Sequence, residues 1–136
     1  MGGHNPPATP YCITTAEHGY VELNVMPSKA GDYALRPNFF HLWPRGDFTL
    51  IALANLDKTF TVTIFAPFKL FEQEMFVAGE PERCYDFFQR HFPDMAKLLG
   101  REHVIETFAR MGAPSALVSI KVVGGEGLSA FIIKGD

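Results

Sequence analysis

The residues most suggestive of cofactor chemistry lie close to the end of the chain, where residues 125–130 read GEGLSA. This hexapeptide matches the GxGxxA variant of the dinucleotide-binding fingerprint. The fingerprint binds a pyrophosphate only where it opens a helix, because the helix N-terminus supplies the N–H groups that contact the phosphates. Residues 129–133 instead continue as a predicted strand, so we interpret the hexapeptide as a hairpin turn.

Neither the histidines nor the cysteines are spaced as metal ligands usually are. The five histidines are His4, His18, His41, His91 and His103, and they form no HExxH pair and have no CxxC companion. Cys12 and Cys84 are far apart, which is more typical of a reduced intracellular protein than of a disulfide framework. Cys84 falls on the apolar stripe of a predicted helix, where a core position is expected. These patterns predict no metal site and no catalytic residue.

The tripeptide Trp43-Pro44-Arg45 has two interpretations. In the structural one, Trp43 packs, Pro44 ends strand pairing because it has no N–H, and Arg45 caps a carbonyl or pairs with an acid. In the functional one, Arg45 binds a ligand. We favour the structural interpretation.

The best functional signal is a pair of neighbouring strands that are apolar on both faces. Phe48 to Asn55 and Thr59 to Ala66 are predicted strands, and the short link between them sets Asn55 opposite Thr59. One face then carries Thr49, Ile51, Leu53, Thr61, Thr63 and Phe65, and the other carries Phe48, Leu50, Ala52, Phe60, Val62 and Ile64. A one-residue slip would exchange the two sets, so the register matters.

One face of this hairpin can pack on the chain's own helices. The threonine-bearing face must meet something else: a second domain, another subunit or a small apolar ligand. Apolar walls with a few hydroxyl groups suit an aromatic ligand. The alternative is an ordinary second core layer, and the residues alone leave both open.

The elements that position the hairpin follow the order strands, helices, strands. Strands are predicted at 20–25, 39–43, 116–123 and 129–133, besides the hairpin, and helices at 68–77, 81–91, 93–99 and 101–110. This order predicts an α+β fold, with a mainly antiparallel sheet and helices on one face. Residues 1–17 are rich in Pro, Gly and Thr and are interpreted as an extended N-terminal arm, and residues 18–136 as one domain.

Composition excludes several classes of partner. The chain of 136 residues is 47% hydrophobic and 20% charged with a net charge of −3, so it is expected to fold and has no basic stripe for nucleic acid. Its apolar runs are too short for a membrane span, and its first residues do not form a signal peptide. An exposed apolar hairpin face predicts self-association.

Several motifs together resemble a known family. They read HGYVEL (residues 18–23), GDYA (31–34), HLWPR (41–45), FTLIALANLDKTFTVTIFAP (48–67), DFF (86–88) and HFPD (91–94). They are similar to the middle segment of the kynurenine 3-monooxygenases, and the resemblance runs from about residue 17 to the end of the chain. HxWPR followed by FxxIALxN is its most specific part, and residues 112–134 match more loosely.

This resemblance implies a flavin-dependent aromatic hydroxylase. In that family FAD, reduced by NADPH, activates O₂ for hydroxylation of L-kynurenine to 3-hydroxykynurenine, a step of tryptophan degradation. The middle segment forms the substrate-binding part of the fold, a sheet that lies over the substrate and the flavin. The family implies a cytoplasmic location, or the mitochondrial outer membrane for eukaryotic members with a C-terminal anchor.

The resemblance also implies site residues. The family's pocket-lining positions fall on Phe40, Thr49, Ile51, Leu53, Thr63 and Phe65, and Asp136 matches a residue that contacts the cofactor. Phe40 and Thr49 depart from the Leu and Met usual in the family, which leaves the exact aromatic substrate open.

The chain alone is expected to be inactive and to retain FAD weakly or not at all, because the family's GxGxxG segment is absent from it. Two alternatives remain from the sequence: a non-catalytic small-molecule binding module, and a related hydroxylase that acts on another aromatic acid.

Overall fold

The computed structural model describes residues 11–122 and 129–133, with the side chains of residues 17–116. Its strands form one six-stranded sheet in the order β2-β3-β4-β1-β5-β6, and every neighbouring pair is antiparallel. The helices lie between the fourth and fifth strands along the chain. The predicted α+β fold with a mainly antiparallel sheet is therefore confirmed.

The elements have the following bounds. The strands are β1 (Tyr11–Val25), β2 (His41–Pro44), β3 (Thr49–Ala54), β4 (Phe60–Pro67), β5 (Ser115–Val122) and β6 (Ser129–Ile133). The helices are α1 (Phe68–Leu70), the π-helical turn η1 (Phe71–Met75), α2 (Arg83–His91), α3 (Pro93–Leu99) and α4 (Arg101–Met111).

Several predicted boundaries are wrong. β1 begins at Tyr11 instead of Tyr20, because its first half pairs with β5, a partner more than a hundred residues away that local alternation does not reveal. β2 begins at His41, two residues later than predicted. Helix α2 begins at Arg83 instead of Pro81, which lies in the preceding turn. The turn predicted from residues 124–127 lies outside the described part of the chain.

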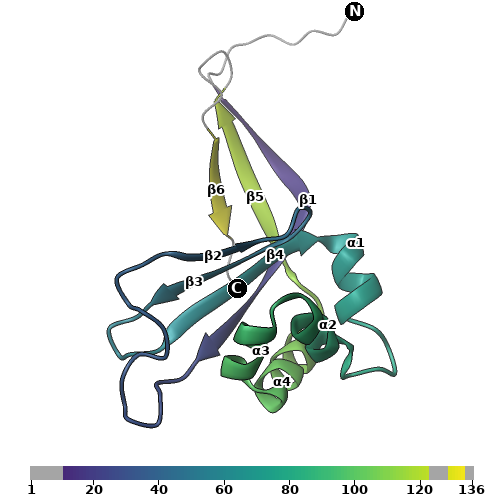
Figure 1. The fold of residues 1–136 in the computed structure, drawn as a ribbon. Helices are drawn as coiled ribbons and strands as arrows, with labels where there is room; N and C mark the ends of the chain where they lie inside the picture. The colour runs from purple at the N-terminus through teal and green to yellow at the C-terminus, as the bar shows by residue number, and fades with distance from the viewer. Residues whose placement is uncertain (1–10, 123–128, 134–136) are drawn as a thin grey trace, which may run out of the picture.

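The helices cover one face of the sheet. Figure 1 shows α2, α3 and α4 grouped against the strands, whereas β5, β6 and the first half of β1 extend beyond them. Beneath the helices, alternate strand residues such as Val21, Leu23 and Ile64 are completely buried. The helices contribute Phe71, Phe88 and other aromatic side chains to the same core. This period-two burial is typical of a sheet with a single covered face.

Gly19 lies where β1 passes from one partner strand to the other. The register of β1 against β5 shifts between Thr15 and Gly19, as in a β-bulge. A Cβ atom at Gly19 would lie 2.7 Å from the carbonyl oxygen of Ser115 and 2.8 Å from a ring carbon of Phe68. Because the nearest atom belongs to the backbone, it cannot move aside easily. This close approach therefore requires glycine at position 19.

Gly19→Ala is expected to lower the free energy of unfolding by about 1–3 kcal/mol, because the added methyl group overpacks the junction. This change in the free energy of unfolding is measured by urea denaturation, monitored by circular dichroism. Gly79→Ala is the control, since its Cβ would meet nothing within 4 Å and only its φ of 79° is unfavourable. Equal losses in the two variants would contradict the steric explanation.

A histidine on α4 accepts a hydrogen bond from the part of β1 that does not pair with β5. The backbone N–H of Asn24 donates a hydrogen bond to Nε2 of His103, with an N···N distance of 3.0 Å. Nε2 can accept this bond only when it carries no proton. Burial lowers the pKa of His103, and the charge of Arg110 lowers it further. The neutral ring is therefore the form that the fold stabilises.

Stability is expected to fall as the pH drops from 7.5 to 5.5. His103 has a lower pKa in the folded chain, so below about pH 6.5, its ordinary value, the unfolded chain binds the proton first and unfolding becomes easier. His91, whose pKa is also lowered by burial, contributes in the same direction. His103→Gln should flatten the pH dependence in urea unfolding, and adding His91→Gln should flatten it further. An unchanged slope would rule out both contributions.

Candidate functional site

The register of the β3–β4 hairpin is the one predicted. Thr49 pairs with Phe65, Ile51 with Thr63 and Leu53 with Thr61. The side chains of the intervening residues, which are Leu50, Ala52, Val62 and Ile64, point toward the helices and are fully buried. The six residues of the predicted second face therefore share the side of the sheet that the helices leave uncovered. We call this side the open face.

The hairpin turn holds this register with side-chain hydrogen bonds. Nδ2 of Asn55 donates to the hydroxyl oxygens of Thr59 (2.9 Å) and Thr61 (3.0 Å). The carboxylate of Asp57 accepts hydrogen bonds from the hydroxyl and the backbone N–H of Thr59, and these bonds lower its pKa. Lys58 takes a left-handed conformation, with φ of 73°, to complete the turn. A slip of one residue would break all of these contacts.

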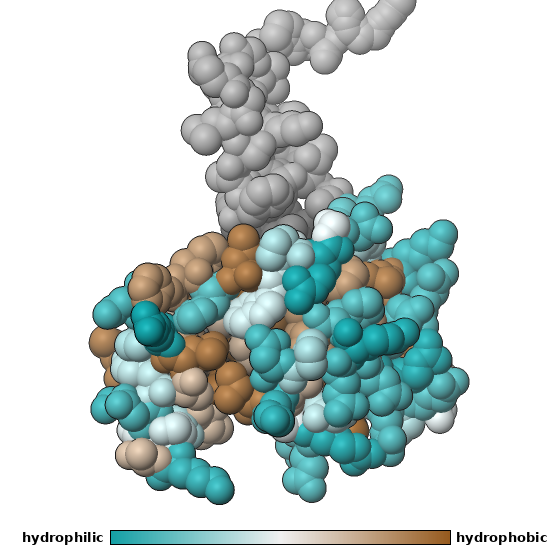
Figure 2. All heavy atoms as spheres, in the orientation of Figure 1, coloured by the Kyte–Doolittle hydropathy of each residue, from teal (hydrophilic) through white to brown (hydrophobic). Residues whose placement is uncertain are grey.

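The open face is apolar and accessible. Leu53 is 47% exposed and Phe40 is 59% exposed, while Thr49, Ile51 and Phe65 are half-buried. In Figure 2 hydrophobic residues gather over the strands at the left, whereas the helical region at the right is mostly hydrophilic. Apolar side chains in such a contiguous patch are characteristic of a binding surface.

The predicted site residues differ in how far their side chains are exposed to solvent. Thr63 is only 4% exposed, so it forms the floor of the open face and not its surface. Phe40 lies just before β2 and outside the residues that pair with β3, and it is 59% exposed. Asp136 lies outside the described residues, so its cofactor contact remains a prediction.

Leu42 and Tyr20 are among the residues of this face that the sequence reasoning missed. Leu42 pairs directly with Ile51 and is 51% exposed. Tyr20 pairs with Phe65, and the ring centroids of the two lie 6.3 Å apart. The alternation within HLWP was a sufficient signal for Leu42. Tyr20 could be found only by knowing that β1 pairs with β4.

The WPR tripeptide fixes the edge of this face to the helices. Nε1 of Trp43 donates a hydrogen bond to the carboxylate of Asp94 at 3.2 Å, at the start of α3. Nε of Arg45 donates to the backbone carbonyl of His91 at 3.2 Å, at the end of α2, and its guanidinium lies 5.2 Å from the ring centre of Phe92. These contacts confirm the structural interpretation: Arg45 caps a carbonyl.

The two side chains on α2 that could be reactive, Cys84 and His91, both pack against apolar neighbours. Cys84 is fully buried, and its burial raises the pKa of the thiol to about 11. A thiol with so high a pKa is a poor nucleophile at neutral pH. His91 packs against Phe48 and Phe87, with ring centroids 5.0 and 4.4 Å away. Cys84 is therefore a core residue, as predicted, whereas His91 is half-buried at the border of the core.

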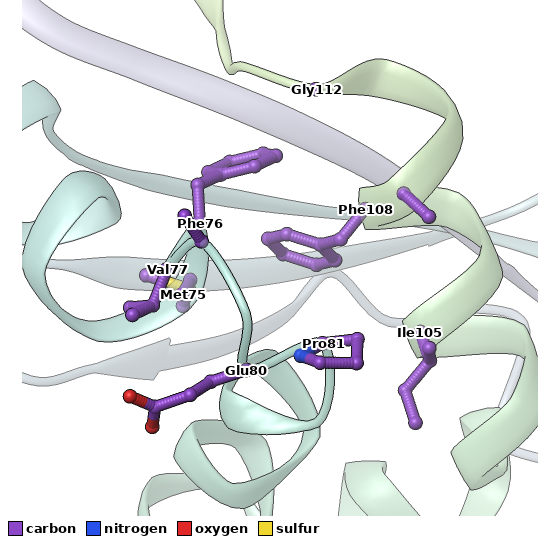
Figure 3. Close-up of a pocket in the computed structure, with 10 residues that line it drawn as sticks. Met75, Phe76, Val77, Glu80, Pro81, Ile105, Phe108 and Gly112 are labelled. Carbon is purple, nitrogen blue, oxygen red and sulfur yellow. The ribbon is translucent and has the colours of Figure 1, made fainter.

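A second hollow lies on the helical side of the molecule. It has a volume of about 310 Å³ between η1, the following loop and α4. Figure 3 shows Phe76 and Phe108 beside one another in its wall, with ring centroids 4.9 Å apart, Ile105 and Pro81 below and the carboxylate of Glu80 turned away. The hollow has apolar walls but no polar group directed into it, so it lacks what would orient a ligand.

Neither a metal site nor a membrane span is found in the part of the chain that the structure describes. No group of three or more His, Cys, Asp or Glu side chains there converges on a point that could hold an ion. Likewise, no described helix is both long and apolar enough to cross a bilayer.

The structure thus defines an α+β unit with one uncovered apolar face, and comparison with known proteins shows what this unit is related to. The chain is 52% identical to kynurenine 3-monooxygenase of Caenorhabditis elegans over 120 residues, and 52% identical to that of Caenorhabditis briggsae. It is 40% identical to the enzyme of Sus scrofa over 119 residues. The chain therefore belongs to the kynurenine 3-monooxygenase family.

These matches cover most of this chain but little of each relative. Each of the three covers 88% of the chain, whereas the chain spans 25% of the length of the two nematode enzymes and 24% of the porcine enzyme. No profile of a known protein family matches the chain. The chain thus corresponds to about a quarter of the kynurenine 3-monooxygenases that it matches.

Arg45→Lys is expected to lower the free energy of unfolding by about 1 kcal/mol, because lysine keeps the charge but loses the hydrogen bond to His91 and the planar stacking on Phe92. Chemical denaturation measures the change. Arg36→Lys is the matched control, since its guanidinium lies 5.9 Å from the ring centre of exposed Phe39. If Arg45→Lys lowered the free energy of unfolding no more than Arg36→Lys does, the contacts of Arg45 with His91 and Phe92 would not contribute to stability.

Proposed function

We propose that this chain is the substrate-binding part of a kynurenine 3-monooxygenase, in which the open face forms one wall of the aromatic site. The observation that carries the proposal is the uncovered apolar face of the β3–β4 hairpin, whose register places Thr49, Ile51 and Phe65 on one side. Its support from sequence is the 52% identity to two enzymes of that name.

The wall suits an aromatic ring in both shape and polarity. Ile51, Leu53 and Phe65 offer aliphatic and aromatic surface for a flat ring, and the hydroxyl of Thr49 adds a polar group at one edge. A ring bound there loses its contact with water on one side. Phe40 narrows one end of the wall and Thr49 leaves more room at the other, so these two positions are proposed to adjust which ring substituents fit.

The oxygen chemistry is assigned to FAD, with NADPH as the reductant. The described residues offer no cradle for its phosphates: the residues directly before α1, α2, α3 and α4 are Pro67, Glu82, Phe92 and Gly100, and no glycine-rich loop opens a helix. We therefore assign to the described residues the binding and orientation of the aromatic substrate. The contribution of Asp136 to flavin binding remains a prediction.

L-Kynurenine is expected to bind the chain with a dissociation constant on the order of 1 mM, because only one wall of the site is present. Titration of ¹⁵N-labelled protein should shift the amide resonances of Ile51, Leu53 and Phe65, and leave those of the buried helices unchanged. Leu53→Glu should weaken binding about ten-fold, since it replaces apolar contact with a charge that loses water against the bound ring.

Leu98→Glu is the control, because Leu98 is 37% exposed on α3, on the helical side of the sheet. Its binding should equal that of the unmodified chain. Two results would refute the proposal: resonance shifts confined to the helical side, or equal binding by the two variants.

A flavin measurement tests the assignment of FAD independently. The purified chain is expected to lack the absorbance of bound flavin after incubation with excess FAD and gel filtration. Stoichiometric retention of FAD would show instead that this chain holds the cofactor itself.

A further inference from the structure

One strand beside the wall carries three chemically active side chains on the open face. His18, Tyr20 and Glu22 of β1 alternate with residues whose side chains face the helices, and they pair in order with Pro67, Phe65 and Thr63 of β4. The β3–β4 hairpin supplies only apolar and hydroxyl groups to this face, so β1 is the strand that adds ionisable groups.

Of these three residues, Glu22 is the one available to a ligand. Tyr20 is 4% exposed, and its ring packs on Phe65. His18 is half-buried beside Gly19, whose surroundings are tightly packed. Glu22 is exposed, and its carboxylate forms no hydrogen bond or ion pair within the described residues.

Its lack of a partner contrasts with some of the acidic residues on the helical side, although others there, such as Glu72, also have no partner among the described residues. There, Glu74 pairs with Arg83 and Arg90, while Glu80 pairs with Arg83. Across the open face, Glu22 is the one carboxylate at the paired positions of β1 to β4. A single unpaired negative charge beside an apolar wall favours a ligand that combines a ring with a cation.

The register sets how far the charge lies from the wall. Glu22 pairs with Thr63, Thr63 with Ile51, and Ile51 with Leu42, so one row crosses four strands. Two inter-strand spacings, about 10 Å at the backbone, separate Glu22 from Ile51. Because Thr63 between them is almost buried, a ligand lying along the row would contact Ile51 at one end and Glu22 at the other.

We infer that Glu22 binds the α-ammonium group of the aromatic substrate and so selects for amino acids over simple aromatic acids. L-Kynurenine carries such a group on the short arm attached to its ring. An ammonium–carboxylate contact is a charge-assisted hydrogen bond, whereas an aromatic acid without the ammonium would meet only a like charge. The inference rests on the proposed function of the open face and assigns the substrate contact that β1 makes.

The test compares two ligands that differ by one group. L-Kynurenine and its desamino analogue, which lacks only the α-ammonium, are titrated into the ¹⁵N-labelled chain. The unmodified chain should bind L-kynurenine about five-fold more tightly. Glu22→Gln keeps the size of the side chain and should abolish this preference, because it weakens the binding of L-kynurenine and removes the repulsion of the analogue's carboxylate. Glu72→Gln, on η1, makes the same change in net charge and should preserve the preference.

The outcomes separate this inference from the function on which it rests. If both ligands shift the resonances of Ile51 and Phe65 but bind equally, or if Glu22→Gln weakens both to the same degree, the role of Glu22 is overturned and the substrate wall stands. If neither ligand shifts those resonances, the proposed function is overturned, and the role of Glu22 with it.

Discussion

A pleated sheet has two faces, and the helices of this chain cover only one of them. The pairing of β3 with β4 decides which residues lie on each side, since side chains alternate strictly along a strand. Leu50 and Ile64 consequently belong to the core, while Ile51 and Phe65 face outward. The fold and the candidate site are thus two results of the same register, and neither can change without the other.

The helices stabilise that register through contacts with the end of β2 and the start of β3. Trp43 and Arg45, at the end of β2, bond to the start of α3 and the end of α2. Phe48, at the entrance to β3, packs on Phe87 and Phe92 of the same helical layer. The edge of the open face is therefore attached to the most aromatic part of the core. The HLWPR motif positions the open face, and Leu42 and Pro44 are the residues of the motif that lie on it.

Much of this arrangement was predictable from the sequence because its determinants are local. A three-residue link and strict alternation were enough to assign Ile51 and Leu53 to the open face, and Pro93 and Gly100 marked both ends of α3. The first half of β1 was not predictable, since its partner β5 lies far along the chain. For the same reason Tyr20 and Glu22 were not recognised as neighbours of the wall: cross-strand proximity depends on tertiary pairing, which periodicity within one segment does not encode.

The end of the sheet at β2 also limits how copies of the chain can meet. This strand is four residues long and finishes at Pro44, which has no N–H to offer an approaching strand. Nε2 of His41 is already bonded to the carbonyl of Arg36 in the preceding loop. Growth of the sheet by addition of a further strand at this edge, the geometry of fibrillar aggregates, is thereby disfavoured. This protection concerns the β2 edge alone, because β6 forms the opposite edge of the sheet.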